Sequence, residues 1–178
     1  MSRTQANGAD AERGSGEATS GGADRSAAGG IGSAPAAPPG RVLVVEDDDD
    51  ARDLIAHLLR REGYEVVPAS GGLAALDLAR EASVDVILLD VMMPEVDGLE
   101  VCRRLRRSPE LASIPVVLLT ALDDMETRAA AMRLGVSEFL TKPIVKDDLY
   151  RRVATQVGVR RRGAALDRVR TRLDSLPG

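Results

Sequence analysis

The sequence has few aromatic residues and a single cysteine, and both shortages limit what the chain can be. Aromatic side chains make up 2% of the 178 residues and tryptophan is absent, so Leu, Val, Ile and Ala must supply the buried area of a core. Cys102 is the only cysteine, which excludes an intramolecular disulfide and a multi-cysteine metal site. We therefore expect an aliphatic core and a cytoplasmic location, where thiols stay reduced.

Long apolar runs and a strong net charge are also missing. No apolar run approaches the roughly 20 residues that a membrane-spanning helix requires, and no apolar segment follows Arg3 as in a secretory signal. A formal net charge of -4 does not by itself indicate binding to nucleic acid or to a membrane. With 44% hydrophobic residues the chain can bury one ordinary domain core, so we expect one folded domain and no membrane partner.

The two ends of the chain differ in composition from its middle. Residues 1–40 are mostly Gly, Ala, Ser and Pro, and we expect them to form a disordered arm. Residues 41–158 are the expected domain, and residues 159–178 are an arginine-rich helical tail that Gly158 and Gly163 are expected to separate from it.

The role of the tail is left open by its sequence. Leu166, Val169, Leu173 and Leu176 follow the a/d spacing of a heptad, but two heptads are too few to predict a dimer. Because the arginines have no interleaved aromatic residues and no second module follows, we expect no DNA-binding domain in this chain. The tail is either an interaction stub or the start of a signalling helix whose output domain lies outside the chain.

Apolar runs alternate with amphipathic helical segments from Arg41 onward, which is typical of repeated βαβ units and a parallel sheet. The apolar runs cover residues 42–45, 64–69, 86–89, 115–119 and 136–140. Residues 86–89 lack polar alternation, as in a strand that is buried on both faces. The predicted fold class is α/β: a doubly wound, five-stranded parallel sheet of the flavodoxin-like order 2-1-3-4-5, with helices on both faces.

The first predicted helix should turn one apolar face toward the sheet, made of Ala51, Leu54, Ile55, Leu58 and Leu59. The acidic residues 48–50 should occupy its first turn, where negative charge favours the helix dipole. Asp97-Gly98 is likewise interpreted as the start of a helix.

Polar side chains come directly at the ends of the predicted strands: Glu46, Asp47, Asp90, Thr120 and Lys142. In the predicted strand order these side chains converge on one crevice at the carboxyl edge of the sheet. Gathered carboxylates repel one another unless a cation lies among them, and hard oxygen ligands suit Mg²⁺, which also accepts phosphate oxygens. The sequence therefore predicts a site that holds Mg²⁺ and phosphate together.

Asp90 is the acid best placed to act as a nucleophile, because it ends the most buried strand and carboxylates can form aspartyl phosphates. Lys142 and a metal ion would neutralise the charge on a transferring phosphoryl group, and the Thr120 hydroxyl would donate to one of its oxygens. Taken singly, each residue has a structural explanation such as a helix cap or a strand-end cation, but the joint pattern favours the site.

The stretch from about Arg41 to Val157 resembles the receiver domain of two-component response regulators, of the single-domain, chemotaxis-regulator-like kind. The matching motifs are Val44-Val45-Glu46-Asp47-Asp48, Leu89-Asp90-Val91-Met92-Met93-Pro94-Glu95-Val96-Asp97-Gly98, Leu119-Thr120-Ala121 and Phe139-Leu140-Thr141-Lys142-Pro143. The resemblance implies the same strand order as the one given above.

The resemblance implies that Asp90 accepts a phosphoryl group from the phosphohistidine of a histidine kinase or phosphotransfer protein. It implies that Asp47, Asp90 and the main-chain carbonyl of Met92 bind Mg²⁺, with Glu46 acting through water. The chain would then be a phosphoacceptor switch, not an enzyme that turns over a substrate.

The resemblance also implies that Thr120 and Lys142 contact the phosphoryl group and that Lys142-Pro143 is a cis peptide. Thr120 and Phe139 would form the switch pair, which changes the face of the fourth helix, fifth strand and fifth helix for a downstream target protein. Homodimer formation on phosphorylation is a second expected response.

Two features depart from the family pattern. Phe139 stands where many members have Tyr, so its ring can pack but has no hydroxyl to form a hydrogen bond. Met92 and Leu122 offer no acid or amide that could orient a water molecule. We therefore predict slow self-dephosphorylation, which a half-life of seconds for the phosphorylated form would refute. The side chains of Met92 and Met93 are expected to fill space.

Two other functions would also place an aspartate at the end of a buried strand. A Mg²⁺-dependent phosphohydrolase of the haloacid dehalogenase kind also uses an aspartate nucleophile, but there it belongs to an Asp-x-Asp pattern after the first strand. Glu46-Asp47 does not match that pattern, and no residues remain for a cap domain. The second alternative is the receiver fragment of a larger hybrid kinase or cyclase, which differs only in what lies outside the chain.

Overall fold

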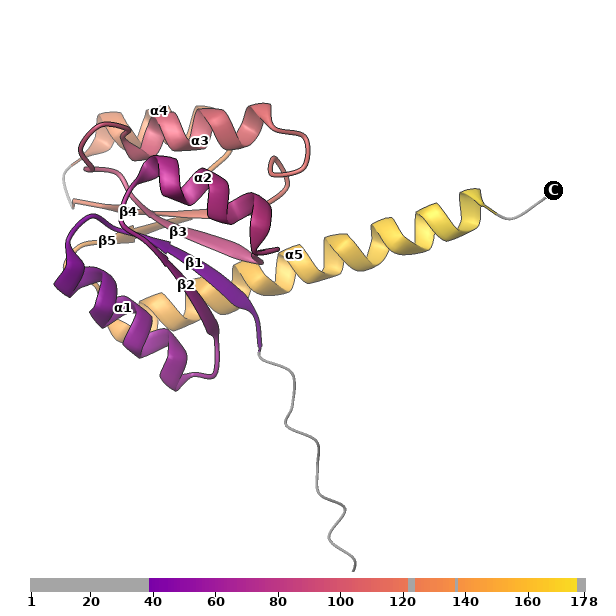
Figure 1. Ribbon diagram of the computed structural model, residues 1–178, viewed down its shortest axis with the longest axis horizontal. Helices are drawn as coiled ribbons and strands as arrows, with labels where there is room; N and C mark the ends of the chain where they lie inside the picture. Colours follow the sequence, from indigo (N-terminus) through magenta and orange to yellow (C-terminus); the bar gives the residue numbers. More distant parts are fainter. Residues whose placement is uncertain (1–38, 122–123, 137, 176–178) are drawn as a thin grey trace, which may run out of the picture. The chain divides into compact units, whose positions relative to one another are not determined.

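Five parallel strands form one sheet of order β2-β1-β3-β4-β5 (Figure 1) in the computed structural model, which describes residues 39–121, 124–136 and 138–175. The strands are β1 (Arg41–Val45), β2 (Glu65–Ala69), β3 (Val86–Asp90), β4 (Val116–Thr120) and β5 (Glu138–Thr141). Every neighbouring pair is parallel, and Val42 lies opposite both Val66 and Val86. The predicted fold class and strand order are confirmed. Most of the arm expected at residues 1–40 lies outside the described residues.

In the described ranges, five helices cover the two faces of this sheet (Figure 1): α1 (Asp49–Arg61), α2 (Gly72–Glu81), α3 (Gly98–Arg107), α4 (Met125–Arg133) and α5 (Lys146–Asp174). Residues of α2, α3 and α4 such as Leu76, Val101 and Ala131 belong to one buried aliphatic cluster. Residues of α1 and α5 such as Leu59 and Leu149 belong to a second cluster on the other face. Both faces of the sheet are therefore buried, as the unbroken apolar strands predict.

Aspartate side chains cap the starts of several helices. The Asp48 carboxylate accepts a hydrogen bond from the Ala51 N–H at 2.8 Å, and the Asp97 carboxylate accepts one from the Glu100 N–H at 2.8 Å. Each cap contributes about 1 kcal/mol because it satisfies an N–H group that has no partner within the helix. The structural interpretation of both residues is confirmed.

Two expectations about the helices are wrong. Leu54 is 59% exposed, because α1 presents Ile55, Ala56 and Leu59 to the core and Leu54 lies about 100° around the helix from Ile55. Helix α5 continues through Gly158 and Gly163 instead of breaking there. Glycine costs about 1 kcal/mol within a helix, and the surrounding Arg, Ala and Leu residues are good enough helix formers to offset that cost.

None of the described helices has the length and apolar character that crossing a bilayer demands.

Candidate functional site

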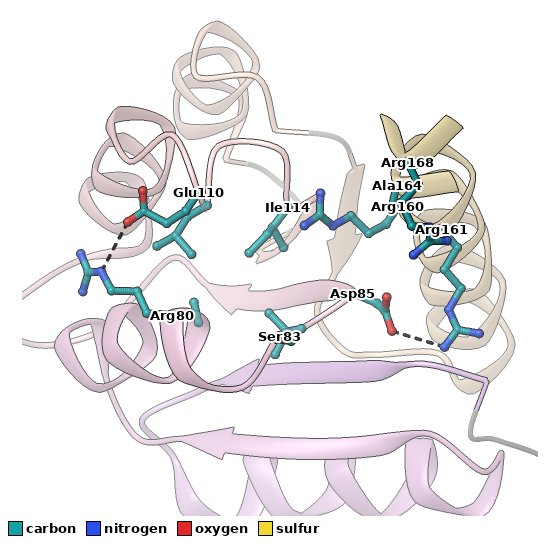
Figure 2. A pocket seen from close by; sticks show the side chains of 12 residues that line it. Arg80, Ser83, Asp85, Glu110, Ile114, Arg160, Arg161, Ala164 and Arg168 are labelled. Atoms are coloured by element: carbon teal, nitrogen blue, oxygen red, sulfur yellow. Dashed lines mark hydrogen bonds and ion pairs between the residues drawn. The ribbon is translucent and has the colours of Figure 1, made fainter. Parts of the chain in front are cut away.

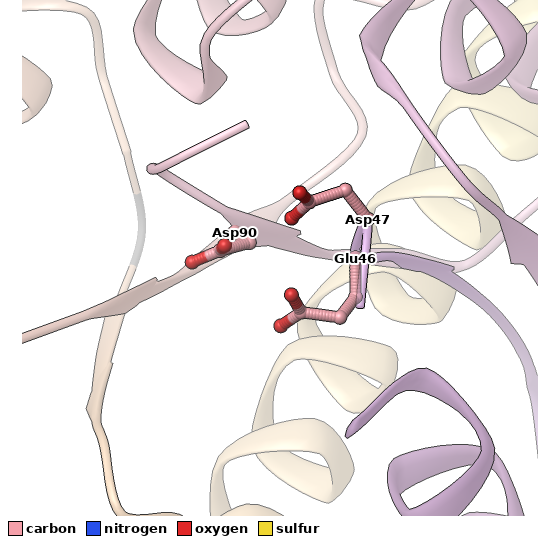
Figure 3. A group of neighbouring side chains, drawn as sticks. All are labelled: Glu46, Asp47 and Asp90. Carbon is pink, nitrogen blue, oxygen red and sulfur yellow. The ribbon is translucent and has the colours of Figure 1, made fainter. Parts of the chain in front are cut away.

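Three acidic side chains meet at the carboxyl edge of the sheet. Glu46 and Asp47 directly follow β1, and Asp90 is the last residue of the neighbouring strand β3. One oxygen atom of each carboxylate lies within 4.8 Å of the others. Figure 3 shows the three side chains gathered at these strand ends. Parallel strands bring their carboxyl ends to one edge, which is why residues 44 positions apart in the sequence become neighbours.

Lys142 connects two of these carboxylates. Its Nζ atom lies 2.8 Å from Glu46 Oε2 and 3.1 Å from Asp90 Oδ1. Burial disfavours the ammonium ion, but hydrogen bonds to Glu46 and Asp90 and the charges of both acids outweigh that effect, so the pKa of Lys142 is raised above its ordinary value. The lysine is therefore charged at neutral pH and faces the Asp90 carboxylate.

The carboxylates crowd one another in a place that water reaches poorly. The side chains of Glu46 and Asp90 are buried, whereas Asp47 is exposed at the mouth of the site. Burial raises the pKa of Glu46, the hydrogen bond from Lys142 opposes this rise, and the charge of Asp90 adds to it. Within the described part of the chain, Asp47 forms no ion pair and only Lys142 pairs with Glu46 or Asp90. One ammonium ion against three carboxylates leaves negative charge that suits a hard divalent cation.

The start of α3 supports the backbone of Asp90. The Gly98 N–H donates to the Val91 carbonyl at 3.0 Å. A Cβ atom at Gly98 would lie 2.9 Å from Val91 Cα and would clash with the Asp90 carbonyl oxygen, so only glycine fits this approach. The sequence predicts Asp97-Gly98 only as a helix start. The signal for the closer role was a glycine right after a capping aspartate, eight residues beyond Asp90.

Thr120 and Phe139 lie on the adjacent strands β4 and β5. Thr120 is buried, and its hydroxyl donates to the Ala121 carbonyl at 3.3 Å, which is a long hydrogen bond. Phe139 pairs in register with Leu118, and its half-buried ring packs against the cluster under α2, α3 and α4. The structure thus places both predicted switch residues on neighbouring strands.

Met92 does not fill space as expected. Its side chain is 77% exposed, because the chain leaves the sheet after Asp90, whereas the Met93 side chain turns inward. Leu122, the second residue linked to slow loss of the phosphoryl group, lies outside the described residues. The peptide bond between Lys142 and Pro143 is cis, as predicted.

Comparison with known proteins gives consistent matches. The sequence profile of the family described as "Response regulator receiver domain" matches residues 42–154. The chain is 38% identical over 117 residues to the uncharacterized transcriptional regulatory protein YrkP of Bacillus subtilis, a match that covers 66% of this chain and 49% of that protein. It is 47% identical over 113 residues to the response regulator PleD of Caulobacter vibrioides, covering 64% of this chain and 25% of that protein.

A solved structure, that of a putative response regulator from Chloroflexus aurantiacus, matches with a TM-score of 0.65 and 32% sequence identity. This match covers 67% of this chain and 98% of the other. The chain spans about half, or less, of the length of the two full-length relatives.

Proposed function

Because the chain belongs to the response regulator receiver family of two-component signalling, we propose that Asp90 is its phosphoacceptor and that phosphorylation switches its binding to other proteins. The observation that best supports this role is the position of Lys142, whose ammonium group lies 3.1 Å from Asp90 and 2.8 Å from Glu46. A positive charge is thus already present where a phosphoryl group on Asp90 would place negative charge.

The donor in this proposal is the phosphohistidine of a histidine kinase or of a phosphotransfer protein. An oxygen of Asp90 forms a bond to phosphorus while the phosphorus–nitrogen bond breaks, and the imidazole leaves with that electron pair and takes a proton from water. The product on this chain is an acyl phosphate. Lys142 pairs with its oxygens, and the Thr120 hydroxyl exchanges its long bond to the Ala121 carbonyl for a bond to a phosphoryl oxygen.

We propose that Asp47, Asp90 and the main-chain carbonyl of Met92 hold Mg²⁺, with Glu46 acting through water. Support comes from the three carboxylates within 4.8 Å of one another, a set of hard oxygen donors that includes one exposed acid. Bound Mg²⁺ supplies positive charge that offsets the charge of the transferring phosphoryl group.

The switch is proposed to run through Thr120 and Phe139. When the Thr120 hydroxyl moves toward the phosphoryl group, it leaves space beside β4. The Phe139 ring of the neighbouring strand then turns inward into that space. The face of α4, β5 and α5 then changes shape and binds a downstream target protein or a second copy of the chain. Because Met92 offers no acid or amide, we propose that the phosphorylated form loses its phosphoryl group slowly.

Phosphorylation by a small phosphodonor tests the role of Asp90. The protein is incubated with the phosphodonor and Mg²⁺, and its intact mass is measured. Wild type and Asp77→Asn, a matched aspartate change on the exposed side of α2, are expected to gain one phosphoryl group. Asp90→Asn is expected to gain none, and Lys142→Ala is expected to react more slowly.

Labelling of Asp90→Asn at the wild-type rate would contradict the proposal. Multiple phosphate releases per chain from phosphomonoesters would instead favour the phosphohydrolase alternative. The receiver fragment of a hybrid kinase or cyclase would give the same labelling, because it differs only outside this chain.

A further inference from the structure

A cavity of about 520 Å³ lies where β3 and β4 begin, and therefore at the opposite edge of the sheet from Asp90, the last residue of β3. Figure 2 shows side chains that line it. Three segments that are far apart in the sequence line it: the end of α2 with the following residues 83–85, the connection between α3 and β4, and the second half of α5. Cavities of this size accommodate small organic ligands. None of the residues proposed for phosphorylation lines it.

The inner wall of the cavity is apolar. Ala79, Val84, Leu111 and Ile114 line it, and each is at most 3% exposed because it also belongs to the core. Apolar atoms make up about half of the exposed lining of the cavity, and a ligand that only offered charge would leave them in contact with water. The wall therefore favours a ligand with an apolar part.

Four arginines surround the opening, and two of them already face acids (Figure 2). Arg161 lies 3.4 Å from Asp85, and Arg80 lies 3.9 Å from Glu110. The remaining two, Arg160 and Arg168, are different. In the described part of the chain neither forms an ion pair, and Arg160 donates instead to the Ser113 hydroxyl at 2.6 Å.

Arg160 and Arg168 occupy one row of α5 with Ala164 between them. The spacing of four residues puts all three on the same side of the helix, and all three line the cavity. Two uncompensated guanidinium groups at the edge of one cavity match a ligand with two negative charges, and guanidinium binds phosphate oxygens in pairs of parallel hydrogen bonds.

We propose that this cavity binds a small organic phosphate of about nucleotide size. Arg160 and Arg168 hold the phosphate oxygens, and the organic part lies against the apolar wall. The carboxylates of Asp85 and Glu110 accept hydrogen bonds from N–H or O–H groups of the ligand. Since the arginines belong to α5 and the wall to the domain, the bound ligand fixes the second half of α5 to the domain.

Calorimetric titration of the full chain tests this proposal, with ADP, AMP, inorganic phosphate and adenosine as probes. The titrations contain EDTA, so that no metal draws phosphate to the acidic site, and about 0.15 M salt to suppress non-specific attraction. ADP or AMP is expected to bind with a dissociation constant of about 10–500 µM, and phosphate and adenosine at least about tenfold more weakly.

The double variant Arg160→Ala/Arg168→Ala is expected to weaken ADP binding at least about tenfold. The matched control Arg170→Ala/Arg172→Ala removes the same charge from the same helix at residues that do not line the cavity, and is expected to bind like wild type. Circular dichroism of both variants verifies that α5 is retained. In amide NMR spectra, the ADP-induced shifts are expected at Ser83 and Asp85 and not at Glu46 or Asp90.

Three results would overturn the proposal. One is no binding of any phosphate probe at about 5 mM, a concentration that detects all but very weak sites. Another is equal weakening in the control variant, which would show attraction to the basic helix as a whole. The third is a set of NMR shifts centred on Asp90, which would place the ligand at the phosphorylation site.

Discussion

The guanidinium group of Arg128 on α4 lies over the ring of Phe139 on β5, with its central carbon 5.2 Å from the ring centre. Arg128 Nη2 is 3.4 Å from the Thr141 hydroxyl, and among the described residues nothing hydrogen-bonds to its buried Nε atom. A cation–π contact of this kind is worth about 0.5–2 kcal/mol. It therefore favours the present half-buried position of the ring over an inward one.

We predict that Arg128→Ala increases the inward population of the Phe139 ring about 2- to 30-fold, the factor that corresponds to loss of the cation–π contact. Phe139 is the only phenylalanine in the chain, so incorporation of fluorophenylalanine gives a single ¹⁹F signal. In the unphosphorylated variant this signal is expected to move toward its position in phosphorylated wild type. The control is Arg133→Ala, at an exposed residue of the same helix. A signal that responds to phosphorylation but not to Arg128→Ala would exclude a restraint by Arg128.

The metal-free protein is expected to depend on Lys142 for stability. Its replacement by alanine leaves the buried carboxylates of Glu46 and Asp90 without an ammonium partner, which costs about 1–3 kcal/mol. Urea denaturation in EDTA measures this loss. Because a divalent cation neutralises the same carboxylates, Mg²⁺ is expected to stabilise Lys142→Ala more than wild type. Lys146→Ala changes the chain's other lysine, which is exposed and contacts the Tyr150 ring away from the acids, so Mg²⁺ should stabilise this variant as much as wild type. Equal Mg²⁺ stabilisation in all three proteins would be evidence against a metal among these acids.

Gly98→Ala is expected to disturb the site without touching any of its charged groups. The new methyl group clashes with the Asp90 carbonyl oxygen, so the chain after β3 must shift, at a cost of about 1–3 kcal/mol. Both the free energy of unfolding and the rate of labelling by a small phosphodonor should fall. The matched control is Gly71→Ala, where the backbone is extended and, apart from its chain neighbours, no described residue lies within 4 Å of the added methyl group. If the Gly98→Ala variant is phosphorylated at the wild-type rate, the close approach of Gly98 to the Asp90 backbone has no role in positioning the Asp90 carboxylate.

The fold and the acidic cluster could be predicted because the information for them is local. Each strand is a short apolar run, and each polar site residue directly ends or follows one of these runs, so the topology of the sheet alone brings Glu46, Asp90 and Lys142 together. The wrong expectations concern the direction in which a helix residue points and the balance between helix-forming and helix-breaking residues. Leu54 differs from its buried neighbour Ile55 by one helical step, and at Gly158 and Gly163 the neighbouring helix formers outweigh glycine.

Other features depend on distances that no sequence pattern reveals. Arg128 meets Phe139 only because α4 packs beside β5, and neither residue has an unusual sequence context. The cavity under α5 likewise joins Arg80, Glu110 and Arg160 through the packing of three separate segments. The topology of a parallel sheet therefore predicts which residues meet at its carboxyl edge. It does not predict which residues meet where helices and connections pack on its faces.

Cys102 on α3 is expected to be an unreactive thiol. Burial raises its pKa to about 11 from an ordinary 9.0, and the charges of Arg106 and Arg103 lower it only in part. The folded state therefore favours the neutral thiol over the thiolate. This preference stabilises the folded protein below pH 9, and the stabilisation is lost as the pH rises through about 11. Iodoacetamide at pH 8.5, about where an unfolded thiol begins to ionise, should modify native protein at least about 100-fold more slowly than protein unfolded in urea. Cys102→Ala should reduce the loss of stability between these two pH values, to which Tyr64 and Lys142 also contribute because their pKa values are raised. A native thiol that reacts as fast as the unfolded one would show that α3 does not bury it.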